Sequence, residues 1–247
     1  MNQAEHAHYR VAVALTPVRS EPSERSEQTT QWHLHQKVEV TDFRPGWCSC
    51  VGLRDGYRGW VAEGQLEPAG DDPFGGGCTF VLSRWARLQR DSETLWVSHG
   101  CAPDSDWQLQ EGAMGPSLPA TGIRLCETAH LYLGTPYLWG GTSIWGIDCS
   151  GLIQQVYAVH GISLPRDAWQ QADSGLKFSD PHKAAAGDLA FFSNDQNRIT
   201  HVGLVLGDGQ ILHASSWVRI DRLTGDGIER GATRQKTHRL SHFCKIL

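Results

Sequence analysis

The spacing of apolar residues changes near Thr121, and this change constrains the fold more than any other feature of the sequence. Residues 9–68 hold only short runs rich in β-branched and aromatic residues, separated by glycine, proline and aspartate. Beyond Thr121, apolar residues recur at the three- and four-residue spacing of helices, and strand-like runs follow them. Helices first and strands after predict an α+β domain over residues 121–247, preceded by all-β structure.

The N-terminal region is predicted to form a small β-barrel over residues 1–70. Its strand-like runs are VAVAL, KVEVTDF, WCSCVGL and YRGWVA, and Asp55-Gly56 between the last two is a typical hairpin turn. The next stretch, residues 71–120, opens with a segment rich in glycine, proline and aspartate and continues with TFVLSRWARL and TLWVSHG. We expect a linker or a degenerate second β unit there.

The C-terminal domain is predicted to hold two helices followed by three strands. The first helix begins after the N-cap Thr121 and ends before Gly134, and the second spans residues 149–161 with Gly161 at its end. The runs DLAFF, HVGLVL and QILHAS are typical of short buried strands.

The composition excludes several functions. The 22 basic and 27 acidic residues leave a net charge of −5, so no basic excess favours nucleic acid or anionic lipid as a partner. No apolar run approaches the roughly 20 residues of a membrane-spanning helix, so we expect no membrane insertion. The start of the chain lacks the apolar core of a secretion signal, and the seven cysteines are an odd number. Both features favour a reducing, cytoplasmic location, with the cell envelope or secretion as the alternative.

Cys149 is the first candidate for chemistry. It stands at the predicted start of a helix, where partial positive charge and N–H groups without helical partners stabilise a thiolate. We expect such a position to lower the cysteine pKa from about 8.5 to about 7 or below. The structural alternative is a small buried residue that merely begins a helix.

His201 and His213 are the candidate partners of this thiolate. If residues 207–209 form a three-residue hairpin loop, Leu206 pairs with Gln210 and the two histidines share one face of the hairpin. A loop of two or four residues would instead place them on opposite faces. On a shared face, His201 is the expected base and His213 the residue that fixes its tautomer.

Neighbouring groups have more than one interpretation. Cys149, His201 and His213 form a competing Zn²⁺ ligand set, but they lack the close local spacing typical of zinc ligands, so no metal is expected. The Tyr137 hydroxyl is placed either to donate to an oxyanion or to pack in the core. Asp148 is expected to cap the helix or to bind a cation.

Four stretches between residues 135 and 216 together resemble the NlpC-type cell-wall cysteine peptidases. They are TPYLWGGTSIWGIDCSGLIQQVY, LPRDAWQQ, AAGDLAFF and HVGLVLGDGQILHASS, in the order of the family. The resemblance implies a papain-like fold with a Cys-His-His triad, in which Cys149 is the nucleophile, His201 the base and His213 the orienting residue. It also implies that Tyr137 belongs to the oxyanion site.

The barrel adds a second resemblance. Residues 9–68, which end in DGYRGWVAEGQLEP, resemble a bacterial Src-homology-3-like domain. Its fusion to the catalytic domain resembles γ-D-glutamyl-L-diamino acid endopeptidases, which cut murein stem peptides and demand a free N-terminal L-Ala. The resemblance implies that Asp148 and Tyr57 hold this amine and that Ser150 lines the pocket. An anion beside a desolvated ammonium is physically reasonable, because the isolated cation would be costly to bury.

The sequence therefore predicts a cysteine peptidase that needs no cofactor and acts on a murein peptide. We expect it to hydrolyse the γ-D-glutamyl–diamino acid amide bond in cell-wall turnover or recycling. Two alternatives remain: an acyltransferase or amidase that uses the same Cys-His-His site, and a wall-binding protein without activity.

Overall fold

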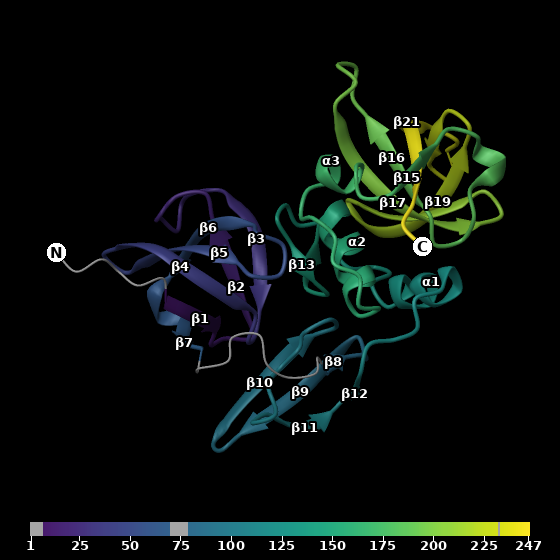
Figure 1. Ribbon diagram of the computed structural model, residues 1–247. Helices are drawn as coiled ribbons and strands as arrows, with labels where there is room; N and C mark the ends of the chain where they lie inside the picture. Colours follow the sequence, from purple (N-terminus) through teal and green to yellow (C-terminus); the bar gives the residue numbers. More distant parts are fainter. Residues whose placement is uncertain (1–6, 70–78, 232) are drawn as a thin grey trace. The chain divides into compact units, whose positions relative to one another are not determined.

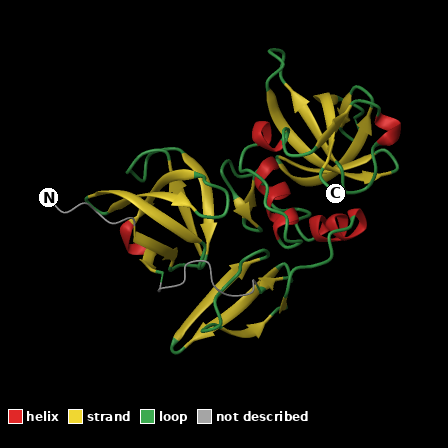
Figure 2. Cartoon of the chain, viewed as in Figure 1, coloured by secondary structure: helices red, strands yellow, loops and turns green. Residues whose placement is uncertain are grey.

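The computed structural model describes residues 7–69, 79–231 and 233–247 (Figure 1). The chain divides into two compact units, residues 1–117 and 118–247. The first unit is built from strands, and the helices longer than one turn all lie in the second (Figure 2). No helix in the described ranges is long and apolar enough to cross a lipid bilayer. The predicted linker segment 71–78, with Cys78, lies outside the described residues.

The first unit begins with a seven-stranded sheet that curls around one core. Its order is β3-β2-β6-β5-β4-β1-β7. The core consists of inward-facing side chains such as Trp32, Val38 and Cys50, all at most 1% exposed. The strands are β1 (Ala7–Val11), β2 (Leu15–Arg19), β3 (Gln28–His33), β4 (Lys37–Arg44), β5 (Trp47–Gly52), β6 (Arg58–Ala62) and β7 (Leu66–Pro68).

The predictions for this sheet are partly confirmed. Strands β4, β5 and β6 are observed, and Asp55-Gly56 lies in the connection between β5 and β6. The run VAVAL is not one strand, because β1 ends at Val11 and β2 begins at Leu15. Strand β3 was not predicted because its sequence, QTTQWH, is mostly polar; Thr30 and Trp32 nevertheless point inward with the two-residue period of a strand.

Residues 79–117 form a second, smaller β region within the first unit. A three-stranded sheet in the order β10-β9-β11 lies beside the pair β12-β8. Their core includes Leu88, Val97 and Trp107, and it also takes in Leu34, which follows β3 of the larger sheet. The strands are β8 (Phe80–Val81), β9 (Trp85–Arg90), β10 (Glu93–Ser98), β11 (Gln108–Glu111) and β12 (Met114–Gly115).

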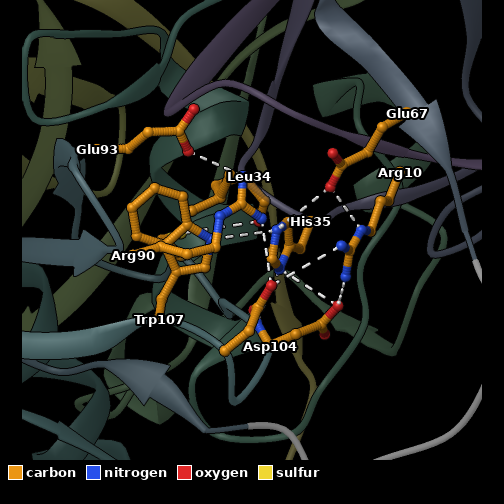
Figure 3. Close-up of polar contacts among 10 residues, drawn as sticks. Arg10, Leu34, His35, Glu67, Arg90, Glu93, Asp104 and Trp107 are labelled. Carbon is orange, nitrogen blue, oxygen red and sulfur yellow. Dashed lines mark hydrogen bonds and ion pairs between the residues drawn. The ribbon is translucent and has the colours of Figure 1, made fainter.

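His35 joins the two β regions of the first unit (Figure 3). Its ring is buried, its Nδ1 accepts a hydrogen bond from the Asp104 main-chain N–H at 2.9 Å, and the indole nitrogen of Trp107 lies 3.3 Å from its Nε2. Arg10 crosses the same junction, because its guanidinium pairs with both Glu67 and Asp104. The small β region is therefore held to the larger sheet by an apolar insertion, Leu34, and by a buried polar contact next to it.

The second unit combines three helices with a sheet that closes on itself. The sheet order is β15-β21-β16-β17-β18-β19-β20, and an additional β20–β21 pairing completes the ring. The helices are α1 (Gly122–His130), α2 (Cys149–Ala158) and α3 (Ala168–Gln171). The strands are β13 (Thr142–Ser143), β14 (Gly146–Ile147), β15 (Leu176–Phe178), β16 (Leu189–Ser193), β17 (Ile199–Gly207), β18 (Gln210–Ser215), β19 (Trp217–Thr224), β20 (Gly227–Glu229) and β21 (Lys236–Lys245).

Successive side chains of the central strands point to opposite faces of the sheet, and each face has its own hydrophobic core. Val202 and Leu204 of β17 face the helices and pack with Leu152 of α2. Val205 faces the inside of the closed sheet, where it packs with Phe192. Complete burial of one such leucine contributes roughly 1.5–3 kcal/mol, so this face fixes α2 against β17. The start of α2 is thereby held at the start of the strand that carries His201.

The predicted helices are confirmed, with shorter bounds. The Thr121 side chain accepts a hydrogen bond from the Arg124 N–H, as expected of an N-cap, and α1 ends at His130. Helix α2 ends at Ala158, and Gly161 follows with a φ of 76°. Ile123, in the first turn of α1, is 70% exposed although it is apolar.

The β17–β18 hairpin follows the predicted register up to Val205, which lies opposite Ile211. A bulge then makes Gly207 the partner of Gln210, so the predicted Leu206–Gln210 pair is wrong. The reason is that the Asp-Gly dipeptide of the loop takes positive φ at both residues, 48° and 67°. Asp-Gly favours this two-residue turn, and the bulge absorbs the extra residue without moving the strands before it.

Candidate active site

Cys149 is the first residue of α2, at the point where this helix meets β17. Asp148 caps the helix, because its Oδ1 accepts a hydrogen bond from the Gly151 N–H at 2.7 Å. The thiol is buried, with 7% of the residue exposed, and the main-chain N–H groups of Val202 and Ser150 hydrogen-bond to its sulfur. The expectation of a cysteine at a helix N-terminus is therefore confirmed.

The expectation of a lowered pKa is wrong. Burial, followed by the nearby Asp148 charge, raises the pKa of Cys149 to about 12, and the two N–H groups and Arg166 oppose this only in part. The helix N-terminus is outweighed because the thiolate would lose its water. The resting group is a neutral thiol, and it must lose its proton to a base as it reacts.

The two predicted histidines meet, and a carboxylate lies behind them. His201 Nε2 is 2.8 Å from His213 Nδ1, and His213 Nε2 is 3.1 Å from Asp221 Oδ2. Between them along the hairpin, Gly203 leaves no space for a side chain, since a Cβ there would lie 2.7 Å from Ile211 Cδ1 and 3.0 Å from the Cβ of His213. Arg219 forms an ion pair with the same Asp221 oxygen at 2.7 Å. The shared face that the hairpin register predicted is confirmed.

This chain of contacts sets the tautomer of both rings. Although burial alone would raise the pKa of Asp221, hydrogen bonds from His213, Arg219 and the Gly231 N–H lower it to about 2. An ionised carboxylate only accepts, so the proton of His213 lies on Nε2 and its Nδ1 accepts from His201. The proton of His201 then lies on its Nε2. Its Nδ1 is the nitrogen with a lone pair, available to take the thiol proton.

His201 and Cys149 lie on adjacent segments. The sulfur contacts the main-chain N–H of Val202, the residue after His201. No hydrogen bond joins the thiol to the His201 ring within the described part of the chain; such contacts often tighten only when substrate binds. Burial, together with the neighbouring His238 and His213, lowers the pKa of His201 well below its usual value. The ring is therefore neutral at physiological pH, as a base must be.

Tyr137 lies beside the nucleophile. Its main chain bridges Ile147, and its N–H donates to the Ser216 carbonyl. Burial first, then the proximity of Cys149 and Asp148, raises the pKa of its phenol above the usual value. The hydroxyl therefore keeps its proton and is able to donate to a negative oxygen, as the predicted oxyanion role requires.

Asp148 and Ser150 belong to a buried network centred on Arg166, which sequence reasoning did not identify. The Arg166 guanidinium binds both carboxylate oxygens of Asp148, and its Nη1 donates to Ser150 Oγ at 2.9 Å. Arg166 is 2% exposed. The expected capping role of Asp148 is confirmed, and its carboxylate also pairs with this arginine; its role toward a substrate amine stays a prediction. The one available signal was the single arginine in LPRDAWQQ, a stretch with no other basic residue.

Tyr57 belongs to the first unit. It lies before β6, where its N–H donates to Asp55 Oδ1 at 3.0 Å and its carbonyl accepts from the Gly52 N–H. The turn therefore holds its main chain. Its predicted part in an amine pocket with Asp148 stays a prediction.

His238, on β21, is a further unpredicted neighbour of the triad. Its ring stacks on that of His201, with centroids 4.1 Å apart and planes 23° apart. It lines a polar cleft of about 790 Å³ at the end of the closed sheet, together with residues such as Phe192 and Arg239. No periodicity pointed to it, because its strand lies in the C-terminal tail, where the sequence has few apolar residues.

Comparison with known proteins agrees with this geometry. A profile of the NlpC/P60 family matches residues 134–237, and a profile of the bacterial SH3 domain matches residues 14–67. The γ-D-glutamyl-L-lysine dipeptidyl-peptidase of Bacillus subtilis is 44% identical over 212 residues, which cover 75% of this chain and 71% of the relative. The chain belongs to the NlpC/P60 family. This family member is accordingly a cysteine peptidase with a papain-like catalytic domain and an N-terminal SH3-type β region.

Two further relatives refine the comparison. The γ-D-glutamyl-L-lysine dipeptidyl-peptidase of Bacillus cereus is 41% identical over 92 residues, which cover 36% of this NlpC/P60 chain and 27% of the relative. The crystal structure of an NlpC/P60 protein from Bacillus cereus has a TM-score of 0.82 at 23% identity and covers 98% of this chain and 100% of its own. That structure supports the fold over nearly the whole chain.

Proposed function

We propose that this protein hydrolyses the amide bond between γ-D-glutamate and the diamino acid of murein stem peptides. The observation that carries the proposal is the juxtaposition of Cys149, at the N-terminus of α2, with a His201–His213–Asp221 chain of defined tautomers. The relative from Bacillus subtilis, whose printed name gives a γ-D-glutamyl-L-lysine bond, supports the choice of substrate.

The reaction follows from the proton positions. As the Cys149 sulfur attacks the amide carbonyl, its proton passes to Nδ1 of His201, and the new imidazolium is stabilised through His213 and Asp221. The Tyr137 hydroxyl and the first N–H groups of α2 hold the oxyanion. His201 then protonates the leaving amine as the C–N bond breaks. Water, deprotonated by the same ring, releases the acyl group from sulfur.

We further propose that the substrate must carry a free N-terminal L-Ala amine. Asp148 and Ser150 flank the nucleophile and are both 6% exposed, so an ammonium reaching them would lose most of its water. Because Arg166 already neutralises Asp148, the amine would share the carboxylate with the guanidinium, and further acceptors are needed. The family resemblance implies that the Tyr57 hydroxyl is one such acceptor.

A mass-spectrometric cleavage assay tests both proposals. The substrates are L-Ala-γ-D-Glu-meso-diaminopimelate and the same peptide with its amine acetylated, and the control is Cys149→Ala. We expect cleavage of the free peptide, loss of that cleavage in the variant, and a preference of about 100-fold or more for the free peptide over the acetylated one. Tyr57→Phe should reduce this preference and leave cleavage of the acetylated peptide unchanged.

The outcomes separate the proposals. Equal cleavage of both peptides would retain the peptidase and overturn the amine requirement. Acyl transfer to an added amine without hydrolysis would favour the acyltransferase alternative.

We also propose that the protein acts on released peptides during wall recycling in a reducing compartment. The six cysteines within the described ranges are all free thiols, which is typical of such an environment. Cell fractionation with an antibody to the chain tests this, and recovery from the envelope or the medium would overturn it.

A further inference from the structure

Two further histidines lie around the ring of His201, which acts as base. His201, His213 and His238 each place a ring nitrogen so that the three atoms lie within 4.8 Å of one another. They come from three strands, β17, β18 and β21. Neutral imidazole nitrogens are preferred ligands of Zn²⁺, which they bind at about 2.0–2.1 Å. This set differs from the Cys149-containing one considered from the sequence.

We propose that these three histidines form an inhibitory zinc site that excludes Cys149. Two features of the surroundings fit a metal. Asp221 accepts from His213 Nε2 at 3.1 Å, which leaves Nδ1 as the nitrogen that faces the site; a carboxylate behind a ligating histidine is the usual arrangement around zinc. His238 also lines the open cleft of about 790 Å³, which provides an entry path and room for a water as fourth ligand.

Zinc at this position would switch off the base through its tautomer. In the active arrangement the proton of His201 lies on Nε2, which contacts His213, and Nδ1 is free to accept the thiol proton. A metal on Nε2 forces the single proton of the neutral ring onto Nδ1. The nitrogen available to Cys149 then donates and cannot accept, so proton transfer from the thiol stops. Removal of the metal restores the original tautomer, and inhibition is therefore reversible.

His238 makes the proposal testable because the proposed reaction does not use it. In His238→Phe the ring that stacks on His201 is kept and the ligand nitrogen is lost. With each protein compared with its own zinc-free rate, the free Zn²⁺ concentration for half-inhibition, set with a metal buffer, should rise by at least about 100-fold in the variant, because one of the three ligands is lost. The matched control is His242→Phe, a histidine of the same strand that contacts Phe191 instead; its zinc sensitivity should equal that of the wild type.

Direct binding separates this site from coordination by the nucleophile. Cys149→Ala should bind one tight Zn²⁺ with the affinity of the wild type in competition with a chromophoric chelator, and Cys149→Ala/His238→Phe should lose it. Co²⁺ bound to Cys149→Ala should show tetrahedral ligand-field bands without a thiolate charge-transfer band. Loss of the site in Cys149→Ala, or unchanged zinc sensitivity in His238→Phe, would overturn the proposal. The Cys149→Ala result decides it even if the His238 variant does not fold.

Discussion

Asp221 decides which nitrogen of each active-site histidine carries the proton. It accepts from His213 on one side and is held by Arg219 and the Gly231 N–H on the other. All of its partners are donors, so the carboxylate has a single ionisation state over the physiological range. The charge of the Asp221 carboxylate therefore determines which nitrogen is protonated in His213 and in His201. Asp221 is not part of the Cys-His-His pattern.

Asp221→Asn should therefore reduce kcat by about 10- to 100-fold with little change in KM. The amide is able to donate to His213 Nε2, which would move the proton of that ring to Nδ1 and, in turn, the proton of His201 to the nitrogen that must accept from the thiol. Steady-state kinetics on the free peptide measures the effect. Asp226→Asn is the matched control, since Asp226 is an exposed acid in the turn between β19 and β20 and pairs with Lys236. A variant that changes KM alone would contradict a positioning role.

The raised pKa of Cys149 has its own consequence. With a pKa of about 12, the fraction of thiolate increases tenfold per pH unit throughout the neutral range. The alkylation rate of Cys149 by iodoacetamide, followed on its peptide by mass spectrometry, should therefore rise without a plateau between pH 6 and pH 9.5. His201→Ala should leave that slope unchanged, because the resting ring carries no positive charge. A plateau beginning below pH 8 would show a thiolate–imidazolium pair instead.

At the scale of elements, the sequence predicted what depends on local pattern. The start of α2 and the face shared by His201 and His213 follow from a cap residue, helical spacing and the alternation of strands, and all are observed. The register survived a wrong loop assignment because the bulge lies beyond the catalytic residues. The residue pattern within a single strand does not show which side chains of other strands will contact it. Asp221 on β19 and His238 on β21 are such contacts, so they were not predicted.

Arg166, whose side chain contacts the N-terminus of α2, was also not predictable from local sequence patterns. Its side chain reaches Asp148 across 18 positions of sequence, and nothing in either local pattern signals the pair. The pKa of Cys149 was mispredicted for a related reason: helix position is local, whereas burial is produced by the whole fold.

At the scale of the whole molecule, each unit has its own cores, and the two β regions of the first unit depend on the short segment that contains Leu34 and His35. Burial, followed by the charge of Arg10, lowers the pKa of His35. Because His35 is harder to protonate in the folded state, its contribution to the stability of the fold is fully present above the unfolded pKa of about 6.5. Below that pH the unfolded chain binds a proton more readily, so the contribution declines as the pH falls.

The attachment of residues 79–117 should therefore loosen in mild acid. Hydrogen exchange of peptides spanning Asp104 and Trp107, corrected for intrinsic rates, should lose protection between pH 7 and pH 5. The corresponding free energy of opening should fall by at most about 1.4 kcal/mol per pH unit. His35→Asn is the matched control, because His35 has a φ of 62°, which asparagine tolerates, and the amide does not titrate. This variant should be less protected at pH 7, and its protection should not change with pH. A wild-type protein whose protection is equally constant would show that other contacts, such as the Arg10 ion pairs, hold the junction.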